Sequence, residues 1–297
     1  MNKNLITLLK FILAIAVFYY LFKNNHIDIS FISALKNNFT LNFLLFSLIL
    51  FTLILGTIRW LIILRNSKVK IKFFEVFKII YICSFFNNFM FGNIGGDALR
   101  ILYVVKISKK NKLKNGFTIF VDRVFGLMGL FCLGLFSYLL ILVNNNQYLI
   151  IFYIFCLILI ILFCFFLLRF IFKKNEKINK LIKFLSLNKN LFFSCIIISI
   201  GLFFTVHLSI FLISSQIFLF KINLNEIFFA NFISSLAGAL PLTPGGIGLS
   251  EASFVFTNNN ILNIYIDNLA NIIIYYRLLI FIFSIPSLYF FFNYKKF

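Results

Sequence analysis

The sequence predicts an all-α integral membrane protein that crosses the bilayer several times. Its 297 residues are 62% hydrophobic, with a mean hydropathy of +1.03, and a soluble fold has too little interior to bury that much apolar surface. Residues 124–168 include no charged side chain, which is long enough for two crossings because one membrane helix needs about 20 apolar residues. Lysines gather in short loops between the apolar runs. We therefore expect a single integral membrane domain over residues 1–297.

Loop charges give the predicted topology, because Lys and Arg are enriched in cytoplasmic loops. We expect six full transmembrane helices, at 5–22, 39–64, 116–143, 148–170, 190–220 and 269–293. The strongly basic segments, placed inside, are 65–72, 106–114, 169–189 and the C-terminus. The loops 144–147 and 257–268 lack basic residues and are placed outside, so both termini are cytoplasmic. Segment 23–38 fits this path least well, since it is placed outside yet holds Lys23 and Lys36.

Two further apolar segments, 73–108 and 225–257, are each interrupted by glycines. The first break reads FGNIGGDALR (91–100) and the second LPLTPGGIGLSE (240–251). An apolar segment, a glycine-rich break and a short helix are typical of a re-entrant hairpin or a discontinuous helix pair. Irregular backbone at membrane depth is tolerated only where protein or a water-filled cavity surrounds it.

The segments 39–143 and 190–293 align as a pseudo-repeat with an offset near 150 residues. Glu75 matches Glu226, Gly95-Gly96 matches Gly245-Gly246, Asp97 matches Glu251, and Arg123 matches Arg277. The acid precedes the arginine by the same distance along the chain in both halves. The loop charges place the ends of the first interrupted segment inside and those of the second outside. Together these patterns predict an inverted repeat of the kind found in transporters.

Arginine is scarce, with six against 22 lysines, and three arginines lie in or beside apolar segments. A charge at membrane depth costs at least about 2.5 kcal/mol, so it usually faces a cavity or a partner. Arginine also grips phosphate through a two-pronged fork. A helix starting at Gly95 or Gly245 would point free amide N–H groups at its break, where anions are favoured. We therefore predict a pocket for a lipid phosphate, formed by Gly95, Gly96, Arg100, Arg123, Gly245, Gly246 and Arg277.

The alternative is that the glycines only permit close helix packing and the arginines pair with Asp97, Asp122 or Glu251. Asp97 and Glu251 are candidates for proton coupling, but acids in a first helical turn also cap the helix. Asp122, beside Arg123, is expected to be its ion-pair partner, and Thr243 to give polar support.

Other chemistry-bearing residues suggest structural roles. We expect Trp60 to be an anchor at the membrane interface and Asp267 to lie on the surface. The five cysteines are expected to be small core residues, and His26 and His207 are too isolated to predict a metal site, so no cofactor or metal is expected.

Three stretches resemble the signature blocks of one known family: GNIGGDALRILYVVK (92–106), FVDRVFGLMGL (120–130) and ALPLTPGGIGLSEASF (239–254). With Tyr276-Arg277, they are similar to the lysylphosphatidylglycerol synthase transmembrane-region family, over about residues 5–293. One departure is Phe91-Gly92, where many relatives have a proline before the first glycine block.

The resemblance implies a flippase-like protein of a bacterial or archaeal inner membrane. In the name-giving enzymes this region moves aminoacylated lipid across the bilayer, while a separate soluble domain attaches lysine. Stand-alone members are implicated in handling other lipids, including polyprenyl-phosphate sugars and hopanoids. The sequence has no polar stretch long enough to fold such a soluble domain.

The function predicted from the sequence is translocation or handling of a phosphate-bearing lipid: a phospholipid, an aminoacyl-phosphatidylglycerol or a polyprenyl-phosphate-linked lipid. The expected partner is membrane lipid rather than nucleic acid. Two alternatives stay open. One is an intramembrane lipid-modifying transferase, for which only Asp97, Asp122 and Glu251 are available as acids or bases. The other is an accessory subunit of an envelope-lipid synthesis complex.

Overall fold

A computed structural model describes residues 38–67, 69–89, 94–108, 112–144 and 189–293, together with Tyr19 and Lys23. This described part is helical and holds no β-sheet. The helices predicted at 5–22 and 148–170, the loops 23–37 and 145–147, and the basic loop 169–188 lie outside it, apart from Tyr19 and Lys23.

Four described segments are long and apolar enough to cross a membrane: Phe39–Asn66, Gly116–Val143, Asn190–Ile217 and Ala270–Phe292. The first three correspond to helix α3 (Phe39–Asn66), to helix α6 (Lys112–Asn144), and to α9 (Lys189–Leu212) with the π-helical turn η2 (Ile213–Ile217). They confirm the predicted helices at 39–64, 116–143 and 190–220. The chain is a multi-pass helical membrane protein.

The last predicted helix, 269–293, is interrupted. Helix α12 (Ala270–Ser284) stops at Ile285-Pro286, and α13 (Ser287–Phe292) follows. Proline has no N–H and its ring clashes with the preceding turn, so it does not continue a regular helix. The amides of Leu288 and Tyr289 bond instead to the carbonyls of Ile285 and Pro286. The span Ala270–Phe292 confirms the predicted helix at 269–293, with a turn at Ile285-Pro286 that the sequence analysis did not foresee.

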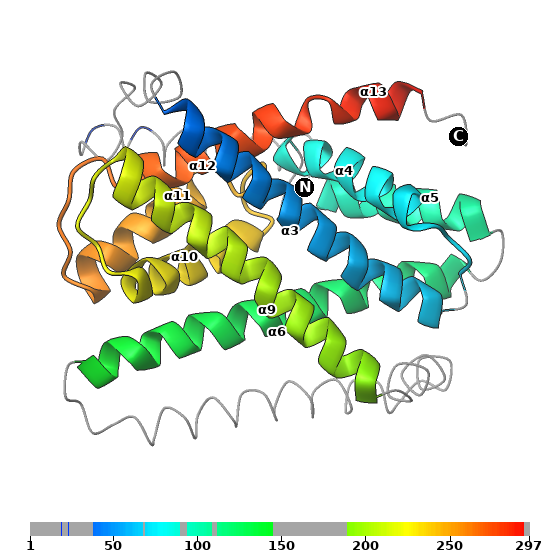
Figure 1. Cartoon of the computed structure of the whole chain (residues 1–297), viewed down its shortest axis with the longest axis horizontal. Helices are drawn as coiled ribbons and strands as arrows, with labels where there is room; N and C mark the ends of the chain where they lie inside the picture. The colour runs from blue at the N-terminus through cyan, green and yellow to red at the C-terminus, as the bar shows by residue number, and fades with distance from the viewer. Residues whose placement is uncertain are drawn as a thin grey trace, which may run out of the picture.

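The two glycine-interrupted segments form two helix pairs, as predicted. The first pair is α4 (Phe73–Phe89) and α5 (Ile94–Ser108); the second is α10 (Leu224–Ala239) and α11 (Leu249–Phe256), extended by the π-helical turn η3 (Thr257–Ile261). The partners of each pair pack on one another. The pairs lie toward opposite ends of the long axis, with α3, α6 and α9 running between them (Figure 1).

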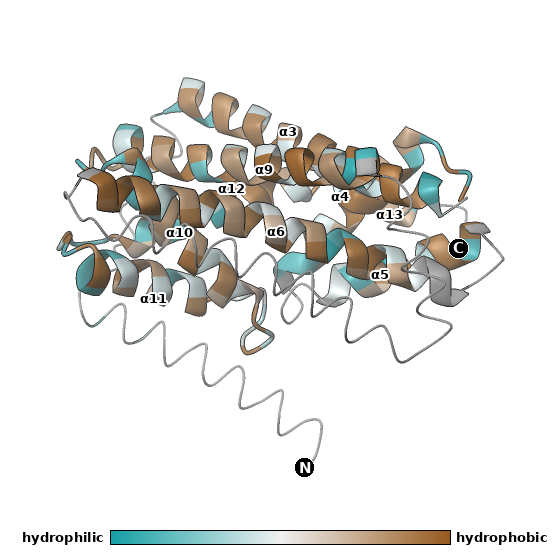
Figure 2. Ribbon diagram, turned by 90° about the horizontal axis from the view of Figure 1, so that it is seen from below, coloured by the Kyte–Doolittle hydropathy of each residue, from teal (hydrophilic) through white to brown (hydrophobic). Residues whose placement is uncertain are grey.

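Hydrophobic residues predominate along the described helices (Figure 2). Large exposed side chains such as Phe39, Phe136, Phe193 and Phe204 lie along the spanning helices. This pattern suits helices that face lipid rather than water. Trp60 is fully buried, so its expected role as an interface anchor was wrong. Its ring packs inside the bundle, under the guanidinium of Arg100 at 4.1 Å from the ring centroid.

Close packing of α6 on α9 depends on Gly129. A Cβ at Gly129 would lie 2.5 Å from the Ser199 Cβ and 2.7 Å from the Ser199 carbonyl carbon. Small residues let the backbones of membrane helices approach closely, and van der Waals packing then stabilises their contact. Gly116, on the same helix, has no neighbour among the described residues within 4 Å of an added Cβ.

We expect Gly129→Ala to destabilise the protein, because the α9 backbone must move to admit the methyl group. The matched control is Gly116→Ala, which should stabilise α6 by about 0.5–1 kcal/mol because Gly is the weaker helix former. Thermal unfolding of the purified protein in detergent checks both. Equal melting temperatures for the two variants would contradict this packing.

Candidate functional site

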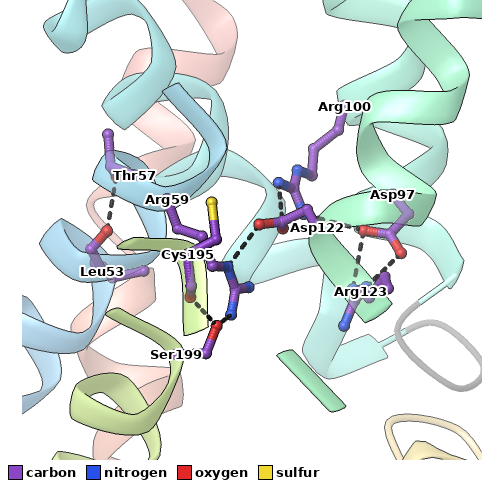
Figure 3. A network of polar contacts seen from close by, with 9 residues as sticks. All are labelled: Leu53, Thr57, Arg59, Asp97, Arg100, Asp122, Arg123, Cys195 and Ser199. Atoms are coloured by element: carbon purple, nitrogen blue, oxygen red, sulfur yellow. Dashed lines mark hydrogen bonds and ion pairs between the residues drawn. The ribbon is translucent and has the colours of Figure 1, made fainter. Parts of the chain in front are cut away.

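Asp122 of α6 lies at the centre of a buried network of charges. One carboxylate oxygen accepts a hydrogen bond from Arg59 Nε of α3 at 2.7 Å, and the other accepts from Arg100 Nη2 of α5 at 2.8 Å. Arg59 Nη1 also donates to Ser199 Oγ of α9 at 2.9 Å. All three charged residues are buried. Four helices are thus tied together through one carboxylate and its partners (Figure 3).

Asp97 extends this network. Its carboxylate accepts from Arg123 Nε at 2.7 Å and from Arg123 Nη2 at 2.9 Å, and Arg100 Nη1 lies 3.5 Å away. The charges therefore alternate along Arg59, Asp122, Arg100, Asp97 and Arg123, as Figure 3 shows. The expectation that Asp122 pairs with Arg123 was wrong, because adjacent residues of a helix point in different directions.

A second cluster surrounds Arg277 of α12. Its Nε lies 2.8 Å from Glu251 Oε1, its Nη1 donates to the Gly245 carbonyl at 2.8 Å, and its Nη2 donates to Ser250 Oγ at 2.5 Å. Glu251 is fully buried, and its Oε2 accepts from the Gly248 amide at 2.7 Å. The capping role foreseen for Glu251 is confirmed, with Gly248 as the N-cap of α11.

The helix expected to begin at Gly245 begins instead at Leu249. Gly245, Gly246 and Gly248 have φ angles of +56°, +69° and +86°, which are left-handed conformations that cannot continue a right-handed helix. The first break matches the prediction better, since Gly95 and Gly96 lie in the first turn of α5. The Gly96 amide already donates to Asn87 Oδ1 at 3.0 Å. Two of the amides expected to receive an anion thus have acceptors within the chain.

Both glycine segments border Asn87 at the end of α4. A Cβ at Gly96 would meet the Asn87 side chain, and a Cβ at Gly245 would lie 2.8 Å from the Asn88 carbonyl oxygen. The predicted approach of the two breaks is therefore seen. Thr243, in the second break, is fully buried.

The two ion pairs occupy matching positions of the two segments that were aligned in the sequence. Asp97–Arg123 joins α5 to α6, and Glu251–Arg277 joins α11 to α12. In each case an acid in the first turn of a helix after a glycine break pairs with an arginine of the next long helix, at the same sequence separation. The spacing noted in the sequence thus corresponds to a contact in both halves.

A cavity of about 370 Å³ lies between α3, α4, α6, α9 and α12. Its polar lining comes mainly from Arg59, Asn87, Arg100, Asp122 and Arg123. Most of the remaining lining is apolar, from side chains such as Leu53, Ile80, Leu202 and Phe283. The cavity therefore has a charged end, and its remaining walls are mostly apolar.

Only part of the predicted phosphate pocket lines this cavity. Arg100 and Arg123 do, whereas Gly95, Gly96, Gly245, Gly246 and Arg277 do not. The alternative in which the arginines pair with acids describes the observed contacts of all three predicted arginines. Arg123 is the most accessible of the cavity's arginines, with 42% of its side chain exposed against 9% for Arg59 and Arg100.

Sequence reasoning missed Arg59, Asn87 and Ser199. Arg59 carried the same signal as Arg123, a rare arginine inside a predicted membrane helix. Asn87 and Ser199 are ordinary polar residues in apolar segments, and only the packing of α4 on α5 and of α3 on α9 brings them to the charges.

Comparison with known proteins matches residues 7–286 to the model of one family, described as the lysylphosphatidylglycerol synthase TM region. The chain belongs to this family. The match spans both ion-pair clusters, both glycine breaks and the cavity. A search of curated proteins finds no match to this chain.

We expect Asp122→Asn to destabilise the protein by about 3 kcal/mol or more, because removing one partner of a buried pair leaves the other charge uncompensated. Here two buried arginines lose their shared carboxylate. The matched control is Asp267→Asn, at an exposed position, where a surface substitution should change stability by less than about 0.5 kcal/mol. Thermal unfolding in detergent measures both. A wild-type melting temperature for Asp122→Asn would refute the central role of this carboxylate.

We expect Arg277→Gln to destabilise the segment 240–248. Arg277 binds the Gly245 carbonyl and pairs with Glu251, whose carboxylate accepts a hydrogen bond from the Gly248 amide at the start of α11. Hydrogen–deuterium exchange should show faster amide exchange in 240–248 than in the wild type. The comparison variant is Arg123→Gln, the counterpart in the other half, whose effect should appear in 94–108. Two results would contradict this. One is an unchanged exchange rate in 240–248 of Arg277→Gln, and the other is faster exchange in the same peptides in both variants; either would show that each ion pair does not stabilise its own helix start.

Proposed function

We propose that this protein translocates or handles a phosphate-bearing lipid, with the head group at the charged end of the central cavity. The observation that carries the proposal is the cavity's composition: arginines at one end and apolar side chains along the rest, between helices long enough to span a bilayer. A lipid presents the same two chemistries in one molecule. The cavity volume of about 370 Å³ lies in the usual range of ligand pockets.

The charge balance favours an anionic head group. The described network has three arginines against two aspartates, which leaves one positive charge in excess. A buried excess charge is costly unless it is neutralised, and one phosphate diester would neutralise it. Arg123 is the best placed to bind, since it is partly exposed and lines the cavity. Among the described residues its Nη1 makes no hydrogen bond, while Nε and Nη2 hold Asp97.

The pseudo-repeat supports movement of the lipid rather than static binding. We infer that the two hairpins enter the bilayer from opposite faces, in an inner membrane with both termini cytoplasmic. The matched ion pairs and the basic loop 65–72 support this arrangement. Inverted repeats with interrupted helices allow one half to rock against the other around a central site.

The test is reconstitution into vesicles with fluorescent lipids of different head groups: phosphatidylglycerol, phosphatidylcholine and a polyprenyl phosphate. We expect the wild type to move at least one anionic lipid between leaflets, as measured by chemical quenching of the outer-leaflet label. Arg123→Ala should lower the rate at least about tenfold, because a charge-assisted hydrogen bond contributes about 1.5–3 kcal/mol.

Two controls sharpen this experiment. Lys221→Gln alters an exposed lysine before α10 and should keep the wild-type rate. Arg123→Lys keeps the charge but loses the fork that holds Asp97, so its rate should fall between those of the wild type and Arg123→Ala. No movement by the wild type across the whole panel would overturn the proposal. New lipid species in the same vesicles, found by mass spectrometry, would support a transferase instead.

A further inference from the structure

A second hollow lies away from the central cavity, at the end of α3. It has a volume of about 810 Å³ and is lined by the end of α3, the connection to α4, the start of α4 and the end of α5. Its cations are Arg65, Lys70 and Lys72, all of which are exposed. None of the residues that line this hollow also lines the central cavity. We call this hollow the basic cleft.

The basic cleft is part of a packed scaffold rather than a loose loop. Val69 and Ile71, which line it, are each 7% exposed and belong to the same buried cluster as Trp60 and Tyr103. Ile107 of α5 packs against this cluster. In the connection between α3 and α4, the side chains of Val69 and Ile71 thus point into the protein. Lys70 and Lys72, which alternate with them along the chain, are exposed.

The depth of the cleft follows from the length of α3. Its 28 residues span about 42 Å at about 1.5 Å per residue, which exceeds the bilayer's hydrocarbon thickness of about 30 Å. Arg65 lies in the last turn of α3. If α3 is centred on the hydrocarbon, its last turn lies beyond the hydrocarbon edge, so the cleft would be level with the phosphates of one leaflet.

The chemistry of the lining matches an anionic phospholipid. Three cations face one acidic residue, Glu75, so the lining attracts negative charge. Arginine and lysine both bind phosphate, the first as a fork and the second as a point charge. Ile107, which is half-buried, offers an apolar contact for the glycerol and first methylene groups of a lipid. Basic pockets between membrane helices bind anionic head groups in this way.

We propose that the basic cleft binds the phosphate head group of an anionic phospholipid from the surrounding leaflet, at a site separate from the central cavity. This site does not depend on the proposed transport function. A lipid held there would contact α3, α4 and α5 together, and α3 and α5 also carry Arg59 and Arg100.

The experiment is lysine modification of the full-length protein in nanodiscs, read out residue by residue by mass spectrometry. Nanodiscs of phosphatidylcholine are compared with nanodiscs containing increasing fractions of phosphatidic acid. We expect Lys70 and Lys72 to be protected from acetylation at low fractions of the anionic lipid. Lys221, an exposed lysine outside the cleft, is the internal control for general attraction to a charged surface.

Arg65→Gln tests whether the three cations share one ligand. Each cation near an anionic surface contributes about 1 kcal/mol, so the fraction of phosphatidic acid that half-protects Lys70 and Lys72 should rise about fivefold. Arg65 is exposed, and an unchanged melting temperature would confirm that the variant folds. A cluster of independent surface lysines would show no effect of this substitution.

Three results would overturn the proposal. The first is equal protection of Lys70, Lys72 and Lys221, which indicates general surface attraction. The second is unchanged protection in Arg65→Gln. The third is equal protection by inorganic phosphate or glycerol phosphate in phosphatidylcholine nanodiscs, which would assign the cleft to a soluble anion.

Discussion

The structure depends on compensating charge inside an apolar body. Asp122 is 3% exposed and holds two arginines that are themselves buried. Each of these charges would be costly alone at this depth, so the helices that carry them have to meet. Asp122 thereby fixes α3, α5 and α6 against one another, and Ser199 adds α9 through Arg59. Apolar packing alone discriminates weakly between membrane helix arrangements, because lipid is as apolar as the side chains.

This constraint changes what the arginines can do. From the sequence alone, an arginine in a membrane helix can be interpreted as a phosphate ligand. In the structure, however, the guanidinium groups of Arg100 and Arg277 bind carboxylates, a hydroxyl group and a carbonyl group of the chain. The capacity of the network to bind an anion comes from its excess of guanidinium groups over carboxylates and from the exposure of the arginine side chain to the cavity. Both criteria single out Arg123, which is partly exposed although it is paired with Asp97.

The sequence predicted those features that depend on local pattern. Long apolar runs located α3, α6 and α9, and glycines located the two breaks. The repeated acid-to-arginine spacing was interpreted as a sign of a repeat, and the structure shows an ion pair at that spacing in both halves. It misassigned the partner of Asp122, because the partner depends on how α3, α5 and α6 are rotated and packed. The start of α11 was misplaced because positive φ angles at Gly245 and Gly246 are set by tertiary contacts, with α4 at Gly245 and with α10 at Gly246. The turn at Ile285-Pro286 could be predicted from the sequence, because proline disfavours a regular helix at its position.

The two halves share one ion pair but differ in what surrounds it. With the offset that superimposes Asp97 on Glu251 and Arg123 on Arg277, Asp122 corresponds to Tyr276 and Arg100 to Phe254. The second half therefore keeps the pair that fixes a helix start but has buried aromatic residues in place of Asp122 and Arg100. Tyr276 lines the central cavity, opposite in character to its counterpart Asp122. A repeat with identical halves would offer a head group two equivalent charged ends; this chain offers one. Under the proposed function, the first half would hold the phosphate, while apolar side chains of both halves line the rest of the cavity.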